Sequence, residues 1–233
     1  MQSPIPCWLI ARKRSGKNLG SERRQNVPKA LDLFCKAGGA SMGLHNAGFE
    51  VTGVDIEPQR NYPFHFVQAD ALTFPLEGFD FIWASPPCQA YSSMSPFSRR
   101  WGKTHPDLVG PVRERLKSTA CRWVIENVRG APLLNPIELC GLMFGLKTYR
   151  HRYFEANFAM LAPSHPKHDQ KAIRERRIFT CVGHPGGRSA RDNLHFGNTE
   201  DWRNALGIKW MKGTELSQAI PPAYSEYIAR RFF

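Results

Sequence analysis

The chain has 233 residues, of which 42% are hydrophobic and 12% aromatic, enough for one well-buried α/β core with a small appendage. Its formal net charge of +12 and sequence pI near 9.7 favour a polyanionic partner such as nucleic acid over an acidic metabolite, without choosing between DNA and RNA. The six cysteines contain no close pair, which argues against a disulfide framework or a zinc ribbon, and no apolar run reaches the roughly 20 residues of a membrane span. We therefore expect a soluble protein of a reducing cytoplasm.

The first segment, residues 1–29, combines seven basic residues with one acidic residue and shows no apolar period. This composition predicts a flexible arm, either a solvated tail or a segment that contacts phosphates. From residue 30 onward, the runs ALDLFC, VTGVDI, FHFVQAD and FDFIWA predict strands, and AGGASMGL predicts a glycine-rich turn that opens a helix. CRWVIENV and RHRYFEANF repeat the strand pattern. The alternation predicts a doubly wound α/β fold with a mostly parallel sheet.

Residues 156–200 are rich in His, Pro, Gly and Arg and have little periodicity, which predicts a small irregular region. Residues 201–233 return to helical spacing, and Pro221 and Pro222 are placed to begin the final helix. In that stretch an apolar residue recurs every four positions, at Leu216, Ile220, Tyr224 and Ile228. We therefore divide the chain into a basic arm (1–29), a main α/β domain (30–155), the irregular region (156–200) and C-terminal helices that return to the main domain (201–233).

Glycine and acidic residues follow the first three predicted strands. Gly38 and Gly39 suit a tight turn whose backbone N–H groups face a cofactor at a helix N-terminus. Asp55 stands where doubly wound folds place the carboxylate that holds ribose hydroxyls, and Asp70 could accept a hydrogen bond from an adenine amino group. Each residue alone is more often an ordinary turn or cap. Their order along successive strands indicates a nucleoside-containing cofactor, and a dinucleotide would fit this scaffold as well.

Two further strands deliver reactive side chains to the same sheet edge. SPPCQ follows FDFIWA directly, so Cys88 is a candidate nucleophile if a helix N-terminus or a cation holds part of it as thiolate. VIENV brings Glu126 and Asn127 to this edge, where a buried carboxyl group has a raised pKa and can donate a proton. The alternatives are a structural cysteine and a capping or ion-paired glutamate.

Five segments, DLFCKAGGASMGL, SPPCQ, VIENV, YRHRYF and LSQAIPPAYSEYIA, resemble in this order the motifs of the cytosine-5 DNA methyltransferase family. The resemblance covers about Ala30 to Phe233, apart from the irregular insert. It implies a Rossmann-like, S-adenosylmethionine-dependent enzyme that methylates carbon 5 of a cytosine flipped out of double-stranded DNA. The alternatives are a tRNA cytosine-5 methyltransferase of the same fold and a catalytically weak DNA-binding homologue.

The resemblance also implies roles for individual residues. Cys88 would add to carbon 6 of cytosine, Glu126 would protonate or hydrogen-bond ring nitrogen 3, and Arg152 would hold the carbonyl oxygen. Asn127 would fix the loop of Glu126, and Arg150 would support Arg152. The implied cofactor-binding residues are Phe34, Lys36, Ala37, Gly38, Gly39, Asp55, Ile56, Asp70, Ala71, Pro86 and Gln218. The implied DNA-binding residues are Gln89, then Ser92, Arg99, Arg100 and Lys103 in a mobile loop over the DNA, and Arg174, Arg176 and Arg177 in the irregular region, which would read the target.

The sequence also departs from the family pattern. Lys36 replaces the usual glycine, and it either points outward or pairs with the cofactor carboxylate; a more anionic cofactor derivative is an alternative hypothesis. Thr148 replaces a glutamine, and Ser217 with Gln218 replaces Gly-Asn. The insert is very short, which favours a short or relaxed recognition sequence, and its four histidines have no closed-site pair spacing, so we expect no metal. We expect a monomer without an obligatory protein partner, in the cytoplasm of a bacterial cell or a phage-infected host.

Overall fold

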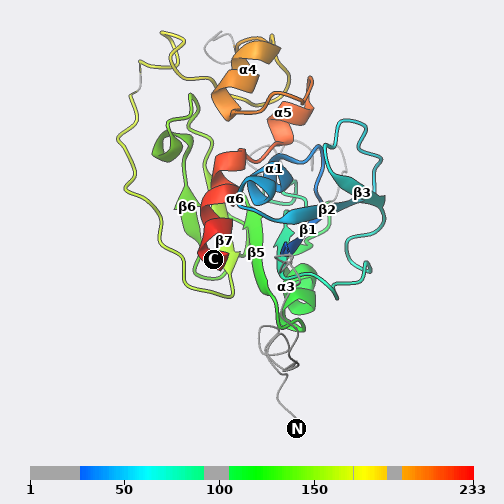
Figure 1. The fold of residues 1–233 in the computed structure, drawn as a ribbon. Helices are drawn as coiled ribbons and strands as arrows, with labels where there is room; N and C mark the ends of the chain where they lie inside the picture. Colours follow the sequence, from blue (N-terminus) through cyan, green and yellow to red (C-terminus); the bar gives the residue numbers. More distant parts are fainter. Residues whose placement is uncertain (1–26, 92–104, 170, 188–195) are drawn as a thin grey trace, which may run out of the picture.

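The computed structural model describes residues 27–91, 105–169, 171–187 and 196–233. Its centre is a 7-stranded sheet in the order β3-β2-β1-β4-β5-β7-β6 (Figure 1). The strands are β1 (Lys29–Leu33), β2 (Glu50–Asp55), β3 (His65–Gln68), β4 (Phe81–Ala84), β5 (Arg122–Asn127), β6 (Ile137–Leu139) and β7 (Arg152–Ala156). Neighbours among β1 to β5 pair in parallel, whereas β7 is antiparallel to both β5 and β6. The predicted doubly wound, mostly parallel fold is confirmed, with one mixed edge.

Helices cover both faces of this sheet. Those in the described residues are α1 (Gly39–Asn46), α3 (Val109–Lys117), α4 (Thr199–Leu206), α5 (Glu215–Gln218) and α6 (Pro222–Ala229), with 3-10 turns η2 (Gly141–Phe144) and η3 (Arg230–Phe232). In β4, Phe81 and Trp83 pack in the cluster beneath α1 and α6, whereas Ile82 and Ala84 pack in the cluster beneath α3. Alternate side chains of the strand thus enter opposite cores, which explains its continuous apolar run.

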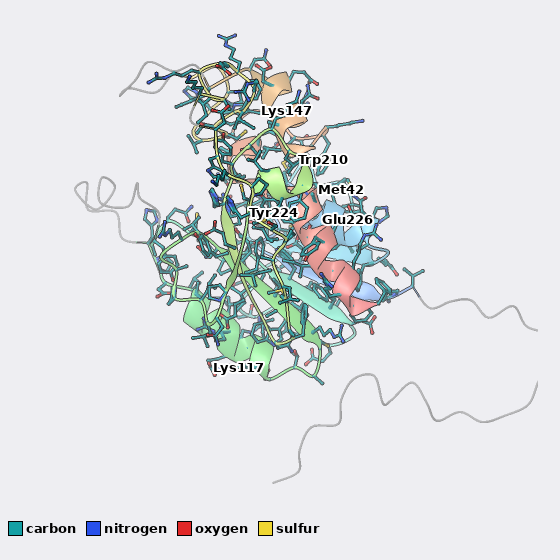
Figure 2. All side chains as sticks on the ribbon, turned by 90° about the vertical axis from the view of Figure 1, so that its left-hand side faces the viewer. Met42, Lys117, Lys147, Trp210, Tyr224 and Glu226 are labelled. Carbon is teal, nitrogen blue, oxygen red and sulfur yellow. The ribbon has the colours of Figure 1, made fainter. Side chains whose placement is uncertain are left out.

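Helices α1 and α6 approach each other closely at glycine positions. A Cβ atom at Gly43 would lie 2.1 Å from the carbonyl oxygen of Pro222, and one at Gly39 would lie 2.4 Å from that of Ile220. Ser225 donates a hydrogen bond to the carbonyl oxygen of Ala40 at 2.8 Å across the same contact. The proline at the start of α6 is confirmed, and the extended residues before it separate α6 from α5. This contact holds the C-terminal helices on the main domain, and Figure 2 shows Met42 of α1 and Glu226 of α6 on the two neighbouring helices.

The structure describes most of the irregular region but only the last three residues of the expected N-terminal arm. Residues 157–169, 171–187 and 196–198 contain no helix or strand, as expected. Lys29 belongs to β1, where its N–H group donates to Asp80 at 2.8 Å, so the expected arm ends before it. Residues 1–26 lie outside the described part of the chain. Within that part, no helix combines the length and apolar character needed to cross a bilayer.

Candidate active site

The turn after β4 presents Cys88 at the carboxyl edge of the sheet. Ser85 donates from its backbone N–H to the carbonyl oxygen of Leu33 at 3.1 Å, and Tyr91 donates to the carbonyl oxygen of Cys88 at 3.0 Å. The Cys88 side chain is partly buried. Burial raises the pKa of its thiol and so does the nearby Glu126 carboxylate, while Arg152 acts in the opposite direction. The thiol is therefore protonated at neutral pH in this geometry.

Cys88 lines a cavity of about 480 Å³ at the ends of the central strands. Glu126 and Arg152 line the same cavity, as do the residues after β1 and β2 that were predicted to bind a cofactor. Parallel strands place their carboxyl ends at one edge, which is where doubly wound folds bind ligands. The cavity therefore brings together the predicted nucleophile, the predicted acid and the predicted cofactor side.

Glu126 and Arg152 form an ion pair inside this cavity. Arg152 Nε lies 3.0 Å from Glu126 Oε1, and the two side chains are 16% and 6% exposed. Burial raises the pKa of Glu126, and the charge of Arg152 partly opposes the shift. Because β7 is antiparallel to β5, the first residue of β7 reaches the edge where β5 ends. This reversed strand is what places the arginine beside the glutamate.

Asn127 and Arg150 lie behind the cavity and do not line it. Asn127 donates to the carbonyl oxygen of Pro86 at 3.0 Å, which ties the end of β5 to the turn that carries Cys88. Arg150 was expected to support Arg152, but its guanidinium donates to the carbonyl oxygens of Cys181, at 2.9 Å, and Ser217. Burial, together with the charge of Arg152, lowers the pKa of Arg150 to about 9, so it remains a cation at neutral pH. Arg150 therefore joins the irregular region to α5.

Most of the residues predicted to bind the cofactor line the cavity. They are Phe34, Lys36, Ala37, Gly39, Asp55, Ile56, Asp70, Ala71, Pro86 and Gln218. Gly38 does not line it; this residue, with φ of +82°, is the left-handed N-cap of α1. The structure thus brings the predicted set together around one cavity, apart from the glycine that begins α1.

Lys36 has a defined place in this turn. Its Nζ donates to Glu57 at 2.8 Å and lies 3.7 Å from Asp55 Oδ1, and its N–H donates to Asp55 Oδ2 at 3.0 Å. Its φ of +45° lies in the left-handed region, which glycine adopts without strain and lysine does not. The backbone therefore explains why a glycine suits this position, and the ion pair with Glu57 holds the lysine side chain at the end of β2.

Asp32 is a site residue that sequence reasoning missed. It lies in β1, is 1% exposed and lines the cavity, and Ser41 donates a hydrogen bond to its Oδ2. Its Oδ1 has no hydrogen-bond partner among the described residues. Burial raises the pKa of Asp32 to about 7. A carboxylic acid inside an otherwise apolar strand was the available signal, because such a group is rarely buried without a task.

The predicted DNA-binding residues are only partly described. Gln89 is exposed and lines the cavity, and Arg174 and Arg176 are exposed in the irregular region. Arg177 is also exposed, but its guanidinium forms ion pairs with Asp169 and Glu175. Four of the residues predicted to contact DNA lie outside the described part of the chain: Ser92, Arg99, Arg100 and Lys103.

Comparison with known proteins finds a matching family and solved structures of similar fold. Residues 29–135 match the family described as C-5 cytosine-specific DNA methylase. Similar solved structures, each with a TM-score of 0.57, include an E. coli prophage-encoded protein assigned as a DNA modification methyltransferase, at 16% identity over 87% of this chain and 97% of that one. They also include DNMT2 of Spodoptera frugiperda (12%; 88% and 99% covered) and the Dnmt2 methyltransferase of S. pombe (14%; 88% and 98% covered). At these identities the structures show a shared fold, and no curated protein sequence matches the chain. The match over residues 29–135 and the shared fold thus relate this chain to the C-5 cytosine-specific DNA methylase family and support its being a methyltransferase.

Proposed function

We propose that the protein transfers a methyl group from S-adenosylmethionine to carbon 5 of a cytosine flipped out of double-stranded DNA. The observation that carries this proposal is the convergence of Cys88, Glu126 and Arg152 on one cavity. A stacked cytosine exposes neither ring face, so the base must leave the duplex before a thiol can reach carbon 6. The net charge of +12 supports a polyanionic substrate.

Each of the three side chains has a distinct chemical task in this proposal. The Cys88 thiolate forms a bond to carbon 6, and the displaced electron pair is stabilised at ring nitrogen 3 by a proton or hydrogen bond from Glu126. Arg152 donates hydrogen bonds to the carbonyl oxygen of the base. S-adenosylmethionine, held at the cavity, would supply the electrophilic methyl group to carbon 5 and leave as S-adenosylhomocysteine. Loss of the proton on carbon 5 to a base or water then allows the bond to Cys88 to break.

The directions of two pKa shifts support these tasks. The raised pKa of Glu126 favours the protonated form that a donor to nitrogen 3 needs. The raised pKa of Cys88 means that attack requires removal of the thiol proton, and Arg152 is the nearby cation that favours the thiolate. Transfer of charge from the sulfur to the base would occur next to the same arginine.

The cavity also suits S-adenosylmethionine. The unpartnered Oδ1 of Asp32 is an acceptor for the cationic ammonium group of the cofactor. Ile56 is 66% exposed at the cavity and offers an apolar face for adenine, while Asp55 and Asp70 offer acceptors for ribose hydroxyls and the adenine amino group. Lys36 is already paired with Glu57, so ordinary S-adenosylmethionine needs no contact from it. Mass spectrometry of the modified base tests this point, since a more anionic cofactor derivative would leave a heavier group than methyl.

We further propose that residues 156–200 read the target sequence, with Arg174 and Arg176 as exposed groups that contact phosphates. Residues 1–26 would add a nonspecific basic contact. We also propose that the enzyme acts as a monomer in the cytoplasm of a bacterial cell or a phage-infected host.

Transfer of a labelled methyl group from S-adenosylmethionine tests the substrate directly. The full chain would be incubated with long duplex DNA and, separately, with a tRNA pool, and the labelled nucleoside identified by mass spectrometry. We expect 5-methylcytosine in duplex DNA and no transfer by Cys88→Ser. Transfer to tRNA alone would assign the enzyme to the RNA alternative, and no transfer to either would support the catalytically weak DNA-binding homologue.

A further inference from the structure

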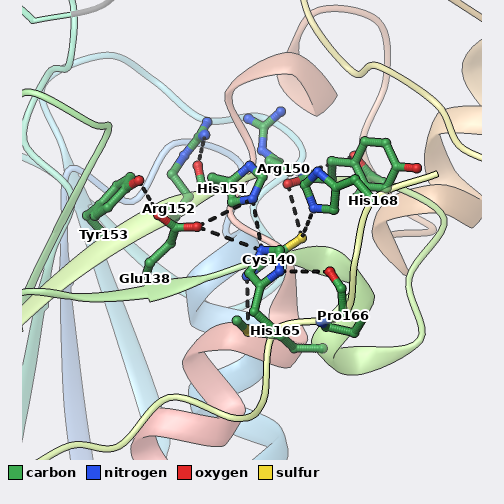
Figure 3. A network of polar contacts seen from close by, with 12 residues as sticks. Glu138, Cys140, Arg150, His151, Arg152, Tyr153, His165, Pro166 and His168 are labelled. Carbon is green, nitrogen blue, oxygen red and sulfur yellow. Dashed lines mark hydrogen bonds and ion pairs between the residues drawn. The ribbon is translucent and has the colours of Figure 1, made fainter. Parts of the chain in front are cut away.

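Four side chains of types that bind metal ions meet where β6 ends and β7 begins, and none of them has a role in the proposed reaction. They are Cys140, which follows β6, His151, which precedes Arg152, and His165 and His168 from the irregular region (Figure 3). Each offers one ligand atom, and these four atoms lie within 4.8 Å of one another. The expectation of no metal considered only the spacing of histidines within the insert. That reasoning missed this set, because two of its members come from outside the insert.

Two distances inside the cluster match the edges of a zinc tetrahedron, and the others are no longer than 4.8 Å. Cys140 Sγ lies 3.4 Å from His168 Nε2, and His151 Nε2 lies 3.2 Å from His165 Nε2. With zinc–sulfur and zinc–nitrogen bonds of about 2.3 and 2.0–2.1 Å, a tetrahedral site has sulfur–nitrogen and nitrogen–nitrogen edges of about 3.5 and 3.3 Å. Two of the six separations therefore already have the length that a bound zinc ion would impose, and the other four need to shorten by at most about 1.5 Å.

Contacts around the cluster orient the two histidines of the irregular region. His165 Nδ1 lies 2.8 Å from the carbonyl oxygen of Pro166, so this nitrogen carries the proton and Nε2 is left with its lone pair. Metal-bound imidazoles commonly have this second contact to a backbone carbonyl or a carboxylate. His168 is held by ring stacking on Tyr149, with centroids 3.9 Å apart. Both histidines of the irregular region are thus pre-oriented as ligands.

A carboxylate borders the cluster and adds negative charge. Glu138 Oε1 lies 3.4 Å from His151 Nε2 and 3.8 Å from His165 Nε2, and Tyr153 donates a hydrogen bond to the other oxygen of Glu138 (Figure 3). Without a metal ion, hydrogen bonds link the four ligand atoms only as two separate pairs, Cys140 Sγ with His168 Nε2 and His151 Nε2 with His165 Nε2. A single cation would be attracted by the whole set and by the carboxylate.

We propose that Cys140, His151, His165 and His168 bind one zinc ion in a closed structural site. One thiolate and three imidazoles form a donor set suited to zinc and unsuited to magnesium or calcium, which prefer oxygen ligands. All four coordination positions are filled by protein, so the ion holds no water for catalysis.

The position of the cluster defines what the ion does. It fastens residues 157–169, which have no helix or strand, to the edge of the sheet formed by β6 and β7. The carbonyl oxygen of His151 accepts a hydrogen bond from Arg152 Nη1 at 2.8 Å. Zinc therefore joins the irregular region to the strand that carries the arginine of the active site.

Metal analysis of the full chain tests the site without reference to methyl transfer. The protein would be purified without a polyhistidine tag or chelator, and its zinc measured by inductively coupled plasma mass spectrometry. We expect about one zinc ion per chain, and X-ray absorption with one sulfur and three nitrogen neighbours at about 2.3 and 2.0–2.1 Å. His165→Ala and His168→Ala should each lose the bound zinc, whereas His184→Ala, an exposed histidine of the same region outside the cluster, should retain it.

Two further measurements distinguish loss of the zinc site from loss of the folded structure. His165 is exposed, so His165→Ala should keep the far-ultraviolet circular dichroism of the unmodified chain. A chelator should lower the Tm of the unmodified chain, and zinc but not magnesium should restore it. The proposal is overturned if the chain as purified lacks zinc and binds none stoichiometrically in competition with a chromophoric chelator. It is equally overturned if the His165→Ala and His168→Ala proteins retain as much zinc as the His184→Ala control.

Discussion

The buried ion pair between Arg113 of α3 and Glu155 of β7 should dominate the response of the fold to mutation. Arg113 Nε and Nη2 donate to the two carboxylate oxygens at 2.6 and 2.7 Å, and the residues are only 9% and 3% exposed. The remaining partners are neutral backbone groups: Nη2 also donates to the carbonyl oxygen of Pro132 at 2.6 Å, and Leu134 N–H donates to Glu155 at 2.8 Å. Loss of one partner leaves a buried charge, which costs about 3–5 kcal/mol. We expect Arg113→Met and Glu155→Gln each to lower the free energy of unfolding by about this amount.

The double variant separates the interaction energy of the ion pair from the other effects of each substitution on stability. Arg113→Met/Glu155→Gln contains neither charge and keeps an acceptor for Leu134, so it should be only about 1–2 kcal/mol less stable than the unmodified chain. Urea unfolding of the four proteins at neutral pH gives the coupling energy as a double-mutant cycle. Single variants within about 1 kcal/mol of the unmodified chain would mean that the pair behaves as an exposed one. Either that result or a double variant as unstable as the sum of the singles would refute the reasoning.

Three further changes probe the packing and the cavity. Gly43→Ala should destabilise the protein by about 1–3 kcal/mol in thermal unfolding, because its Cβ would lie 2.1 Å from the Pro222 carbonyl oxygen, whereas Gly110→Ala, which meets nothing within 4 Å, should not. Burial raises the pKa of Asp32 from 3.8 to about 7, so the folded protein keeps a proton that the unfolded chain releases, and stability should fall as pH rises between these values. Asp32→Asn should abolish this pH-dependent loss of unfolding free energy, which amounts to at most roughly 4 kcal/mol. If the unfolding free energy of the variant fell with pH as steeply as that of the unmodified chain, the raised pKa of Asp32 would be contradicted. Glu126→Gln should reduce the rate of single-turnover methyl transfer by roughly 100- to 1000-fold, measured at a temperature where circular dichroism shows the variant to be folded, and an unaltered rate would exclude Glu126 as the donor.

The central strands and the turns after them could be predicted because local sequence determines both. The four residues of β4 are completely buried between two layers of helices, so the run FIWA is apolar throughout, and the turn that follows it carries Cys88. The same reasoning places Glu126 after the apolar part of β5. Strand β6 was not predicted, because it has only three residues and its middle one is Glu138. Such a short edge strand is defined by its pairing with β7 and not by a hydrophobic period.

Features that depend on contacts between distant segments could not be read from the sequence. The direction of the long Arg150 side chain is set by the carbonyl oxygens of Cys181 and Ser217, which reach it only after the chain has folded. The zinc ligands show the same limit, since His165 and His168 meet Cys140 only because the irregular region crosses the edge of the sheet. Sequence spacing detects ligand sets within one segment and misses sets assembled from several.

Bond formation between Cys88 and carbon 6 of cytosine is the central step of the proposed mechanism. Long duplex DNA in which 5-fluorocytosine replaces cytosine contains every short recognition sequence, and fluorine on carbon 5 cannot leave as a proton, so the adduct persists. With S-adenosylmethionine present, we expect the unmodified chain to form a complex with this DNA that survives denaturing electrophoresis, and Cys88→Ser to form none. A chain that methylates ordinary DNA without being trapped on the fluorinated duplex, or a Cys88→Ser protein that is trapped equally, would contradict the mechanism.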